Sequence, residues 1–443
     1  MLTKKYKTYT LHNYKKLPYL SHLTNEDIDA IRVVGNVLPF KTNNYVIDEL
    51  IDWNNIPDDP IFTLTFPRRE MLSKPNYNKV AQCLNDKVDI KTLKTQVNKI
   101  RMKLNPNPAG QQHNVPTMND VELHGMQHKY RETVLFFPSQ GQTCHAYCSF
   151  CFRWPQFSGI NELKFAMKEA TLLHKYLSRH KKVSDVLFTG GDPLTASSKI
   201  ISTYIEPLLN DKELAHIQNI RIGSKTLAYW PYRFLSDKDS DDILRLFEKV
   251  VQAGKHIAFQ AHFNHPVELS TPAVQEAIRR VRNTGAQIRT QSPLLKHIND
   301  DARTWATMWK EQVRLGLIPY YMFVARDTGS KVFFELPLER TWKIFRKAYS
   351  QVSGVCRTVR GPSMSAYAGK IHIVGVTEIH GEKVFVLRFL QCRNPNLVDI
   401  PFFAQFDPKA TWFNQLKPAF GEDQFFFEKD NLLDVSNHNI DYL

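Results

Sequence analysis

The strongest constraint on the fold is a repeated rhythm between about residues 130 and 325. Short runs of β-branched or aromatic residues alternate there with longer amphipathic, charged segments. Six strands are predicted, at Val134–Phe137, Asp185–Thr189, Ile217–Ser224, Ile257–His265, Ile288–Ser292 and Ile318–Val324. Because each strand is followed by a helical pattern, the chain is predicted to be an α/β protein with a parallel sheet. The pattern alone leaves open whether that sheet is a barrel or an open, doubly wound sheet.

Polar clusters stand where these strands are predicted to end. They are QGQ (140–142) with a cysteine group just after it, GGDP (190–193), GSKT (223–226), HFNH (262–265), TQS (290–292) and ARD (325–327). In parallel β/α sheets the carboxyl ends of the strands carry the chemistry, because they gather at one edge. This coincidence predicts an enzyme.

The flanking segments read differently from the core. Residues 1–125 are a mixture of helical and loop patterns, interrupted by turn-rich stretches at 53–62 and 104–116. Beyond 354 the chain becomes strand-rich, with strands predicted at Lys370–Val376 and Lys383–Leu390. We expect three parts, namely an N-terminal helix and loop segment (1–125), the β/α core (126–353) and a C-terminal segment (354–443) that packs against one mouth of the core.

Composition excludes several classes of protein. Aromatic residues make up 12% of the chain, including 28 Phe, which argues against disorder. No window approaches the roughly 18 consecutive apolar residues of a membrane helix, so a cytoplasmic protein is expected. The 58 Lys and Arg outnumber 44 Asp and Glu, for a net charge of +14. That charge would suit nucleic acid, a membrane surface or an anionic ligand, but its even spread favours a solvated surface.

Three of the six cysteines crowd into one short segment. Cys144, Cys148 and Cys151 have the spacing Cys-x3-Cys-x2-Cys on the loop after the first predicted strand. Thiolates held this close suit an iron–sulfur cluster or zinc. No second CxxC or HxxxH pair lies nearby to complete a structural zinc site, which favours the cluster and leaves zinc as the alternative. A cluster held by three cysteines keeps one iron available to a small molecule.

With Phe150 before the last cysteine, this segment resembles the cluster loop of radical S-adenosylmethionine (SAM) enzymes. GGDP (190–193) resembles their GGE/GGD element, which contacts the SAM amino group. The resemblance implies a partial (β/α)6 barrel, with a [4Fe–4S] cluster on Cys144, Cys148 and Cys151 whose open iron binds SAM. It implies SAM contacts from Phe150, Gly190, Gly191, Asp192 and Pro193. Ser224 and Gln291, at predicted strand ends facing the same site, are further candidates.

The resemblance narrows to the lysine 2,3-aminomutase family and extends from IPDDPI (56–61) to VLRFL (386–390). The similar segments are NPNPAG (105–110), KYRETVLFF (129–137), RIGSKT (221–226), HFNHP (262–266), QSPLLKHIND (291–300), PYYMFV (319–324) and GKIHI (369–373). It implies an isomerase that moves an amino group from C2 to C3 of a free amino acid and also uses pyridoxal 5′-phosphate (PLP). Lys370 stands at the position of the family's Schiff-base lysine, although AYAG precedes it instead of a run of glycines.

Other residues are assigned by the same resemblance. Arg153 corresponds to the arginine that holds the substrate carboxylate, and Lys129, Tyr130 and Arg131 lie near the PLP contacts. An electron donor such as flavodoxin or ferredoxin is implied, and a homo-oligomer stays open. The family's separate zinc-binding cysteines have no counterpart, so no zinc is predicted.

Departures from the family pattern concern the substrate. Arg326 and Ser363 stand where lysine-specific members carry two aspartates that receive the distal ammonium of the substrate. A guanidinium in a closed site would repel that ammonium, so we hypothesise an acidic amino acid such as glutamate or aspartate, with Arg326 as its partner. Two other readings stay open: a radical SAM enzyme that does not use PLP, and a basic nucleic-acid-binding protein with a structural metal.

Overall fold

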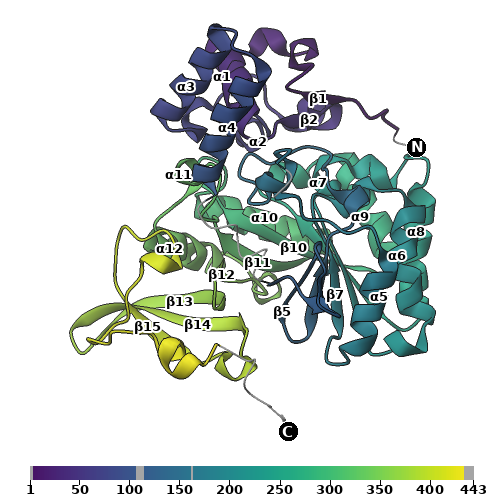
Figure 1. Cartoon of the computed structure of the whole chain (residues 1–443), viewed down its shortest axis with the longest axis vertical. Coiled ribbons are helices and arrows are strands. Elements are labelled where there is room, and N and C mark those ends of the chain that lie inside the picture. The colour runs from purple at the N-terminus through teal and green to yellow at the C-terminus, as the bar shows by residue number, and fades with distance from the viewer. Residues whose placement is uncertain (1–2, 106–113, 161–162, 434–443) are drawn as a thin grey trace.

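One sheet of eleven strands organises the molecule. The computed structural model describes residues 3–105, 114–160 and 163–433, and Figure 1 shows its arrangement. In this sheet the strands follow the order β15-β14-β13-β12-β11-β10-β9-β8-β7-β6-β5. The outer strands β5 and β15 do not pair with each other, so the sheet stays open. Most of the NPNPAG segment and the acidic tail beyond 433 lie outside the described residues.

The middle of the sheet is the predicted β/α core. Strands β6 to β11 pair with their neighbours in parallel. Their bounds are β6 Thr133–Phe136, β7 Asp185–Phe188, β8 Asn219–Ser224, β9 His256–His262, β10 Gln287–Leu294 and β11 Ile318–Val324. The six predicted strands are therefore confirmed within a few residues, and the open sheet confirms a partial (β/α)6 barrel rather than a closed one.

Helices follow the parallel strands and cover one face of the sheet (Figure 1). They are α5 Ala170–Arg179, α6 Ser198–Asn210, α8 Ser240–Gln252, α9 Pro272–Asn283, α10 Ala302–Arg314 and α12 Leu338–Tyr349, whereas the short helices α7 Thr226–Tyr229 and α11 Lys331–Phe334 lie next to the N-terminal layer. Local sequence explains their bounds: at α9, Thr271 caps the first turn by accepting from the backbone N–H of Val274, and Pro272 opens the helix. Alternation on β8 buries Ile220 and Ile222.

The N-terminal part is a layer of helices above the sheet in Figure 1. It holds α1 Asn25–Val37, α2 Pro60–Thr65, α3 Lys74–Asn85 and α4 Ile90–Leu104, with a small pair of strands, β1 Thr8–Thr10 and β2 Lys41–Asn43. A hairpin, β3 Thr117–Met118 and β4 Val121–Glu122, leads into β5 Met126–Tyr130. The buried side chains of this layer and of the β/α core form one continuous hydrophobic cluster.

The C-terminal part extends the same sheet. Strand β12 Arg360–Ser365 pairs in parallel with β11, and β13 Gly369–Ile379, β14 Glu382–Cys392 and β15 Pro401–Gln405 follow as antiparallel strands. The sequence did not predict β12, because RGPSMS (360–365) contains Gly and Pro and no β-branched or aromatic residue. This part buries a second hydrophobic cluster that includes Phe389, Phe402 and Phe427.

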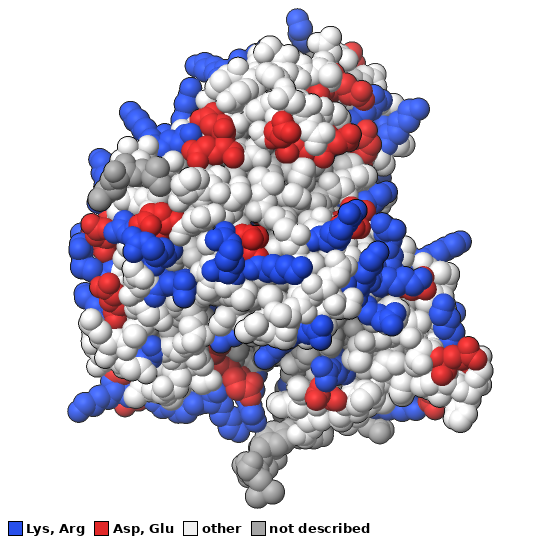
Figure 2. Space-filling model, turned by 180° about the vertical axis from the view of Figure 1, so that it is seen from behind, with Lys and Arg blue, Asp and Glu red and all other residues white. Residues whose placement is uncertain are grey.

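The surface carries mixed charge. On the face in Figure 2, Lys and Arg side chains are scattered, with Asp and Glu among them. This distribution agrees with the solvated surface expected from the sequence. Within the described ranges, none of the helices is long and apolar enough to cross a membrane.

Candidate active site

The cysteine segment follows β6 and is held by the N-terminal layer. The backbone N–H of Tyr147 donates to the carbonyl of Lys41 (2.8 Å), and that of Ser149 donates to Leu64 (2.9 Å). The Tyr6 hydroxyl donates to the carbonyl of His145 (2.7 Å). The loop is therefore fixed between the carboxyl ends of the strands and a cover formed by the first part of the chain.

The glycines of GGDP allow the loop after β7 to touch the cysteine loop. The backbone N–H of Asp192 donates to the carbonyl of Thr143 at 2.6 Å. A Cβ atom on Gly191 would lie 2.4 Å from that carbonyl oxygen, closer than any side chain tolerates. Gly190 has a φ of +144°, which favours glycine. At Gly191 backbone therefore meets backbone, whereas a Cβ atom on Gly190 would lie 2.2 Å from the side-chain nitrogen of Gln142.

The three cysteine thiols are half-buried and influence one another. Burial raises the pKa of Cys151 to about 12, and the neighbouring Cys148 adds to the shift. The pKa of Cys144 is raised well above its ordinary value by burial, then by Asp192 and the other two thiols. Without metal the thiols therefore stay protonated. Bound iron would reverse this preference, because iron binds the thiolate form.

The three thiols do not converge on a single point. Among residues 3–105, 114–160 and 163–433, no three His, Cys, Asp or Glu side chains form the ligand set of one metal ion. In a cubane cluster each cysteine binds a different iron, so its ligands surround a volume. Three soft ligands on one short loop fit such a cluster with one open iron.

Asp192 and Ser224 bind each other. The Asp192 carboxylate accepts hydrogen bonds from the Ser224 hydroxyl (2.8 and 2.9 Å), the Lys225 backbone N–H (2.9 Å) and the Thr226 hydroxyl (3.0 Å). Burial raises the pKa of Asp192, and these donors lower it. Both side chains were predicted to contact the cofactor. In the structure they join the ends of β7 and β8, and their contact with the cofactor stays a prediction, while Pro193 opens the short helix Pro193–Thr195.

Gln291 lies at the end of β10, as predicted, and meets His262 from β9. The Gln291 side-chain amide donates to Nε2 of His262 at 2.5 Å. Burial lowers the pKa of His262 to about 3, and the charges of Lys225 and Arg153 add to the effect. The imidazole is therefore neutral and accepts this hydrogen bond.

Arg153 lies beside the cysteine loop. Its guanidinium is 4.6 Å from the ring centre of Phe137 and 5.1 Å from that of Phe152, and it reaches the carbonyl of Gly190 at 3.5 Å. Burial lowers the pKa of Arg153 to about 10. The charge of Cys151 raises that pKa and the charge of Arg326 lowers it, so both groups lie near Arg153. Phe150 packs edge-to-face on Phe334, with ring centres 6.3 Å apart.

Lys370 lies at the start of β13, opposite Ser365 of β12. Its Nζ donates to the side-chain carbonyl of Gln391 (3.0 Å) and lies 4.2 Å from the ring centre of Tyr321. Burial lowers the pKa of Lys370 to about 8. Such a desolvated amine is a good nucleophile near neutral pH, which fits the attachment of a carbonyl cofactor.

Three cations lie near the amine of Lys129, and together with Lys129 we call them the cationic cluster: Lys129, Arg326, Lys370 and Arg393. Burial lowers the pKa of Lys129 to about 7, and the charges of Arg393, Arg326 and Lys370 lower it further. The Lys129 ammonium donates to the carbonyl of Ala366 at 2.7 Å. Of the ion pairs among the described residues, one involves this cluster, between Arg326 and Asp327 at 3.8 Å. The region therefore attracts anions.

The predicted substrate residues are buried and incompletely bonded. Arg326 donates from Nη1 to the carbonyl of Ser365 (3.0 Å), whereas its Nε and the Ser363 hydroxyl are buried without a hydrogen-bond partner in the described structure. The Arg326 guanidinium lies 5.3 Å from the ring centre of Phe152 and 5.5 Å from that of Trp412. Buried donors normally find acceptors, so these two are available to a ligand.

Tyr130 and Arg131, both predicted to lie near PLP, have different surroundings in the structure. Tyr130 is buried near Tyr321 and Arg326, and burial raises its pKa. Arg131 instead forms an ion pair with its neighbour Glu132 at 2.6 Å, on a side chain that is 37% exposed. The sequence missed Arg393 and Trp412, because they come from segments after β14 and β15 that carry no motif.

Comparison with known proteins gives sequence relatives of one kind. A protein of Aquifex aeolicus (strain VF5), provisionally assigned as an L-lysine 2,3-aminomutase, is 30% identical over 399 residues, covering 90% of this chain and 93% of its own length. The L-lysine 2,3-aminomutase of Clostridium subterminale is 25% identical over 54% of this chain and 53% of its own length. The glutamate 2,3-aminomutase of Clostridioides difficile (strain 630) is 26% identical over 48% and 47%, respectively.

Comparisons with family models and solved structures add little. No family model matches the chain. Among solved structures, a radical SAM methyltransferase from Sphaerobacter thermophilus aligns with a TM-score of 0.37 and 12% identity, over 53% of this chain and 68% of its own. That similarity is too distant to carry an inference.

Replacing Gly191 by Ala should separate the two loops. The new Cβ would meet the Thr143 carbonyl oxygen at 2.4 Å, and the backbone must move, at a cost of about 1–3 kcal/mol in the free energy of unfolding. Urea unfolding and iron content after anaerobic reconstitution measure both effects. Gly354→Ala is the control, because its Cβ meets nothing within 4 Å. Equal stability and iron content in the two variants would contradict the close approach.

The pKa of Lys370 predicts an unusual reactivity. A neutral amine attacks carbonyl compounds, so modification of Lys370 by pyridoxal and cyanoborohydride should be half-maximal near pH 8. An ordinary lysine reaches that point only near pH 10.4. Peptide mass spectrometry across a pH series reports Lys370 and exposed lysines in one sample. If Lys370 follows the exposed lysines, its amine is not desolvated.

Proposed function

This chain belongs to the lysine 2,3-aminomutase family of radical SAM enzymes, and we propose that it is a PLP-dependent 2,3-aminomutase whose substrate carries an anionic side chain. The observation that carries this proposal is the cationic cluster, in which Lys370, Lys129, Arg326 and Arg393 share one buried region with a single ion pair among the described residues. Such a region needs anions to neutralise it. A phosphate and the carboxylates of an amino acid supply them.

The environment of Lys370 supports PLP. Its amine lies over Tyr321 and has a pKa of about 8, so about a tenth of it is unprotonated at pH 7, far more than of an ordinary lysine. The charge of Lys370 lowers the pKa of Lys129, so the two amines are close. A phosphate held by Lys129 would therefore lie beside the amine of Lys370. Arg393 and the buried Tyr130 complete a set of donors around that position.

Each cofactor would contribute chemistry that side chains cannot provide. When bound, PLP supplies a conjugated π-system that delocalises an unpaired electron, and the cluster with SAM supplies the radical that removes a hydrogen atom. The protein's part is to hold both near one substrate. Arg153 and Arg326 both lie against the Phe152 ring beside the cysteine loop, so Arg153 can bind the α-carboxylate, and the N-terminal layer covers the cysteine loop.

The substrate side chain is assigned to Arg326. Its Nε is a buried donor with no hydrogen-bond partner among the described residues, since the carboxylate of Asp327 lies 3.8 Å away, and Phe152 and Trp412 lie against its guanidinium. A planar guanidinium held this way can donate two parallel hydrogen bonds to a carboxylate. The ammonium of a lysine substrate would instead meet a like charge in a region of low dielectric constant. Ser363, whose buried hydroxyl also lacks a partner, can add a further hydrogen bond.

Borohydride reduction tests PLP attachment. Protein reconstituted with PLP under anaerobic conditions, reduced and digested, should yield one pyridoxyl adduct, on Lys370. Lys370→Arg should abolish it, because a guanidinium does not condense with the aldehyde. Lys383→Gln serves as the control, since this lysine lies on the neighbouring strand β14 with a half-exposed side chain.

If the cluster forms and SAM is cleaved but no adduct appears on Lys370, the chain is a radical SAM enzyme that does not use PLP. Zinc in place of iron and sulfide, together with salt-dependent retention on nucleic acid, would instead favour a nucleic-acid-binding protein.

Reversing the charge at Arg326 tests the substrate class. Arg326→Asp should lower kcat/KM for an acidic amino acid by about 100-fold, because a close buried charge pair contributes 2–5 kcal/mol. The same variant should gain turnover of lysine. Arg346→Asp, on the exposed face of α12, is the control for a charge change outside the site. If wild-type protein turns over lysine faster than glutamate or aspartate, the assignment of Arg326 is wrong.

A further inference from the structure

We propose that Tyr229 sets the reduction potential of the iron–sulfur cluster by donating a hydrogen bond to the sulfur of Cys148. The inference rests on the proposed function, in which Cys148 is a cluster ligand. The proposal adds Tyr229 as a residue that acts on the cluster through Cys148. It is a positioning residue rather than a catalytic one.

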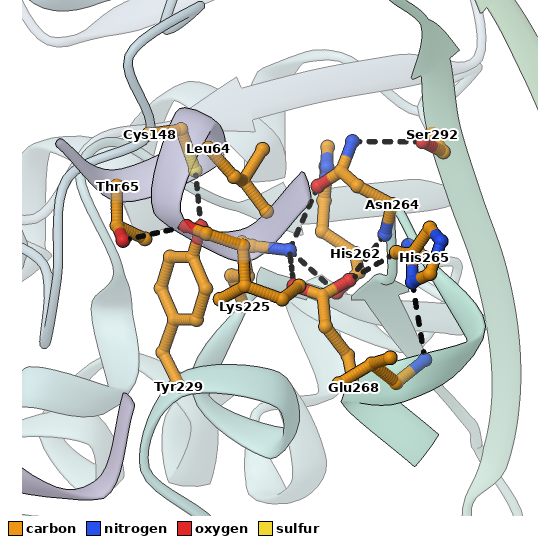
Figure 3. Close-up of polar contacts among 12 residues, drawn as sticks. Leu64, Thr65, Cys148, Lys225, Tyr229, His262, Asn264, His265, Glu268 and Ser292 are labelled. Atoms are coloured by element: carbon orange, nitrogen blue, oxygen red, sulfur yellow. Dashed lines mark hydrogen bonds and ion pairs between the residues drawn. The ribbon is translucent and has the colours of Figure 1, made fainter. Parts of the chain in front are cut away.

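The contact is direct and buried. The Tyr229 hydroxyl lies 3.5 Å from Sγ of Cys148, and 1% of the residue is exposed (Figure 3). Either atom could donate when the cysteine is a free thiol. An iron-bound thiolate has no proton, so the phenol must then be the donor. Among the described residues, no other side chain forms a hydrogen bond with a thiol of Cys144, Cys148 or Cys151.

The position of the phenol is fixed by its helix. Tyr229 ends α7, which begins directly after β8 at Thr226. The Thr226 hydroxyl donates to the Asp192 carboxylate at the start of this helix (3.0 Å), and at its end the Tyr229 carbonyl accepts from the side-chain amide of Asn43 (2.9 Å). These contacts hold the backbone of α7, and the burial of the Tyr229 ring keeps its hydroxyl beside the sulfur.

The ammonium of Lys225, held by neighbouring side chains, polarises the phenol of Tyr229. The Lys225 ammonium lies 4.4 Å from the ring centre of Tyr229, where a cation draws electron density from the ring and strengthens its O–H as a donor. Lys225 is held there by Glu268 (2.6 Å), whose side chain is fully buried, and by the side-chain oxygen of Asn264 (2.8 Å). Asn264 in turn donates to the Ser292 hydroxyl at 2.8 Å (Figure 3).

The physical consequence concerns electron transfer. Reduction adds a negative charge that is shared between iron and sulfur, so a hydrogen bond to a ligand sulfur stabilises the reduced form more than the oxidised form. Loss of the bond should make the cluster harder to reduce. Because the cluster must be reduced before SAM is cleaved, Tyr229 would determine which electron donors are strong enough.

The test is a potentiometric titration followed by electron paramagnetic resonance. The full chain, reconstituted anaerobically and without SAM, is compared with Tyr229→Phe, which keeps the ring and removes the hydroxyl. The equilibrium constant for one-electron reduction should fall about tenfold, which corresponds to a potential about 59 mV more negative. Tyr6→Phe is the matched control, because its hydroxyl donates to the backbone of the same loop and to no sulfur. Its potential should equal that of the wild type.

A second variant guards against misfolding of the first. Placing 3-fluorotyrosine at position 229 keeps the hydroxyl and makes it a stronger donor, so the potential should shift in the opposite direction. Opposite shifts in the two variants support the proposal. Equal potentials in wild type, Tyr229→Phe and the fluorinated protein, at equal iron content, overturn it. If the wild-type protein itself forms no [4Fe–4S] cluster, the proposed function fails, which is a different result.

Discussion

The buried carboxylate of Asp192 is the contact on which the site depends. The backbone N–H of Asp192 donates to the cysteine loop after β6. The carboxylate oxygens of Asp192 accept from Ser224, Lys225 and Thr226 at the end of β8. The ends of the three consecutive strands β6, β7 and β8 are thereby joined through one residue, Asp192. Gly191 makes this possible, because a side chain there would meet the Thr143 backbone and push the loops apart, and Gly190 adopts the positive φ that precedes the contact. The same tie fixes the start of α7, and through it the phenol of Tyr229 beside Cys148.

Electrostatics divides the site into two regions. Around the cysteines the charges balance: Lys225 pairs with Glu268, and Asp192 is surrounded by donors. Around Lys370 they do not: Arg326 and Arg393 lie near Lys129, and burial together with these neighbouring charges lowers the pKa of Lys129 to about 7. A folded protein keeps such a concentration of positive charge only where anions bind. Arg153 stands between the two regions and experiences charge from both.

The sequence predicts the framework better than the site. Hydrophobic periodicity located β6 to β11, because each strand is a local pattern, and the cysteine spacing is likewise local. Strand β12 was not predicted, because its strand conformation depends on pairing with β11 rather than on its composition. The resemblance located Arg326 and Lys370, but nothing local indicates that Arg393 approaches Lys129 or that Trp412 stacks near Arg326. Asp192 belongs to a motif, yet only the fold reveals that its carboxylate bonds within the protein. Such contacts join residues far apart in sequence, so they follow from the tertiary structure alone.

The central claim is that an acidic amino acid is isomerised between Arg153 and Arg326. The most direct measurement follows the nitrogen atom. Fully loaded enzyme is incubated anaerobically with SAM, reductant and glutamate or aspartate labelled with ¹³C at C2 and C3 and with ¹⁵N at the amino group, and the coupling between ¹⁵N and ¹³C is read by nuclear magnetic resonance. The account predicts that the coupling moves from C2 to C3 for an acidic substrate. Coupling that stays at C2 for both acids, in enzyme that moves the nitrogen of lysine under the same conditions, would contradict it.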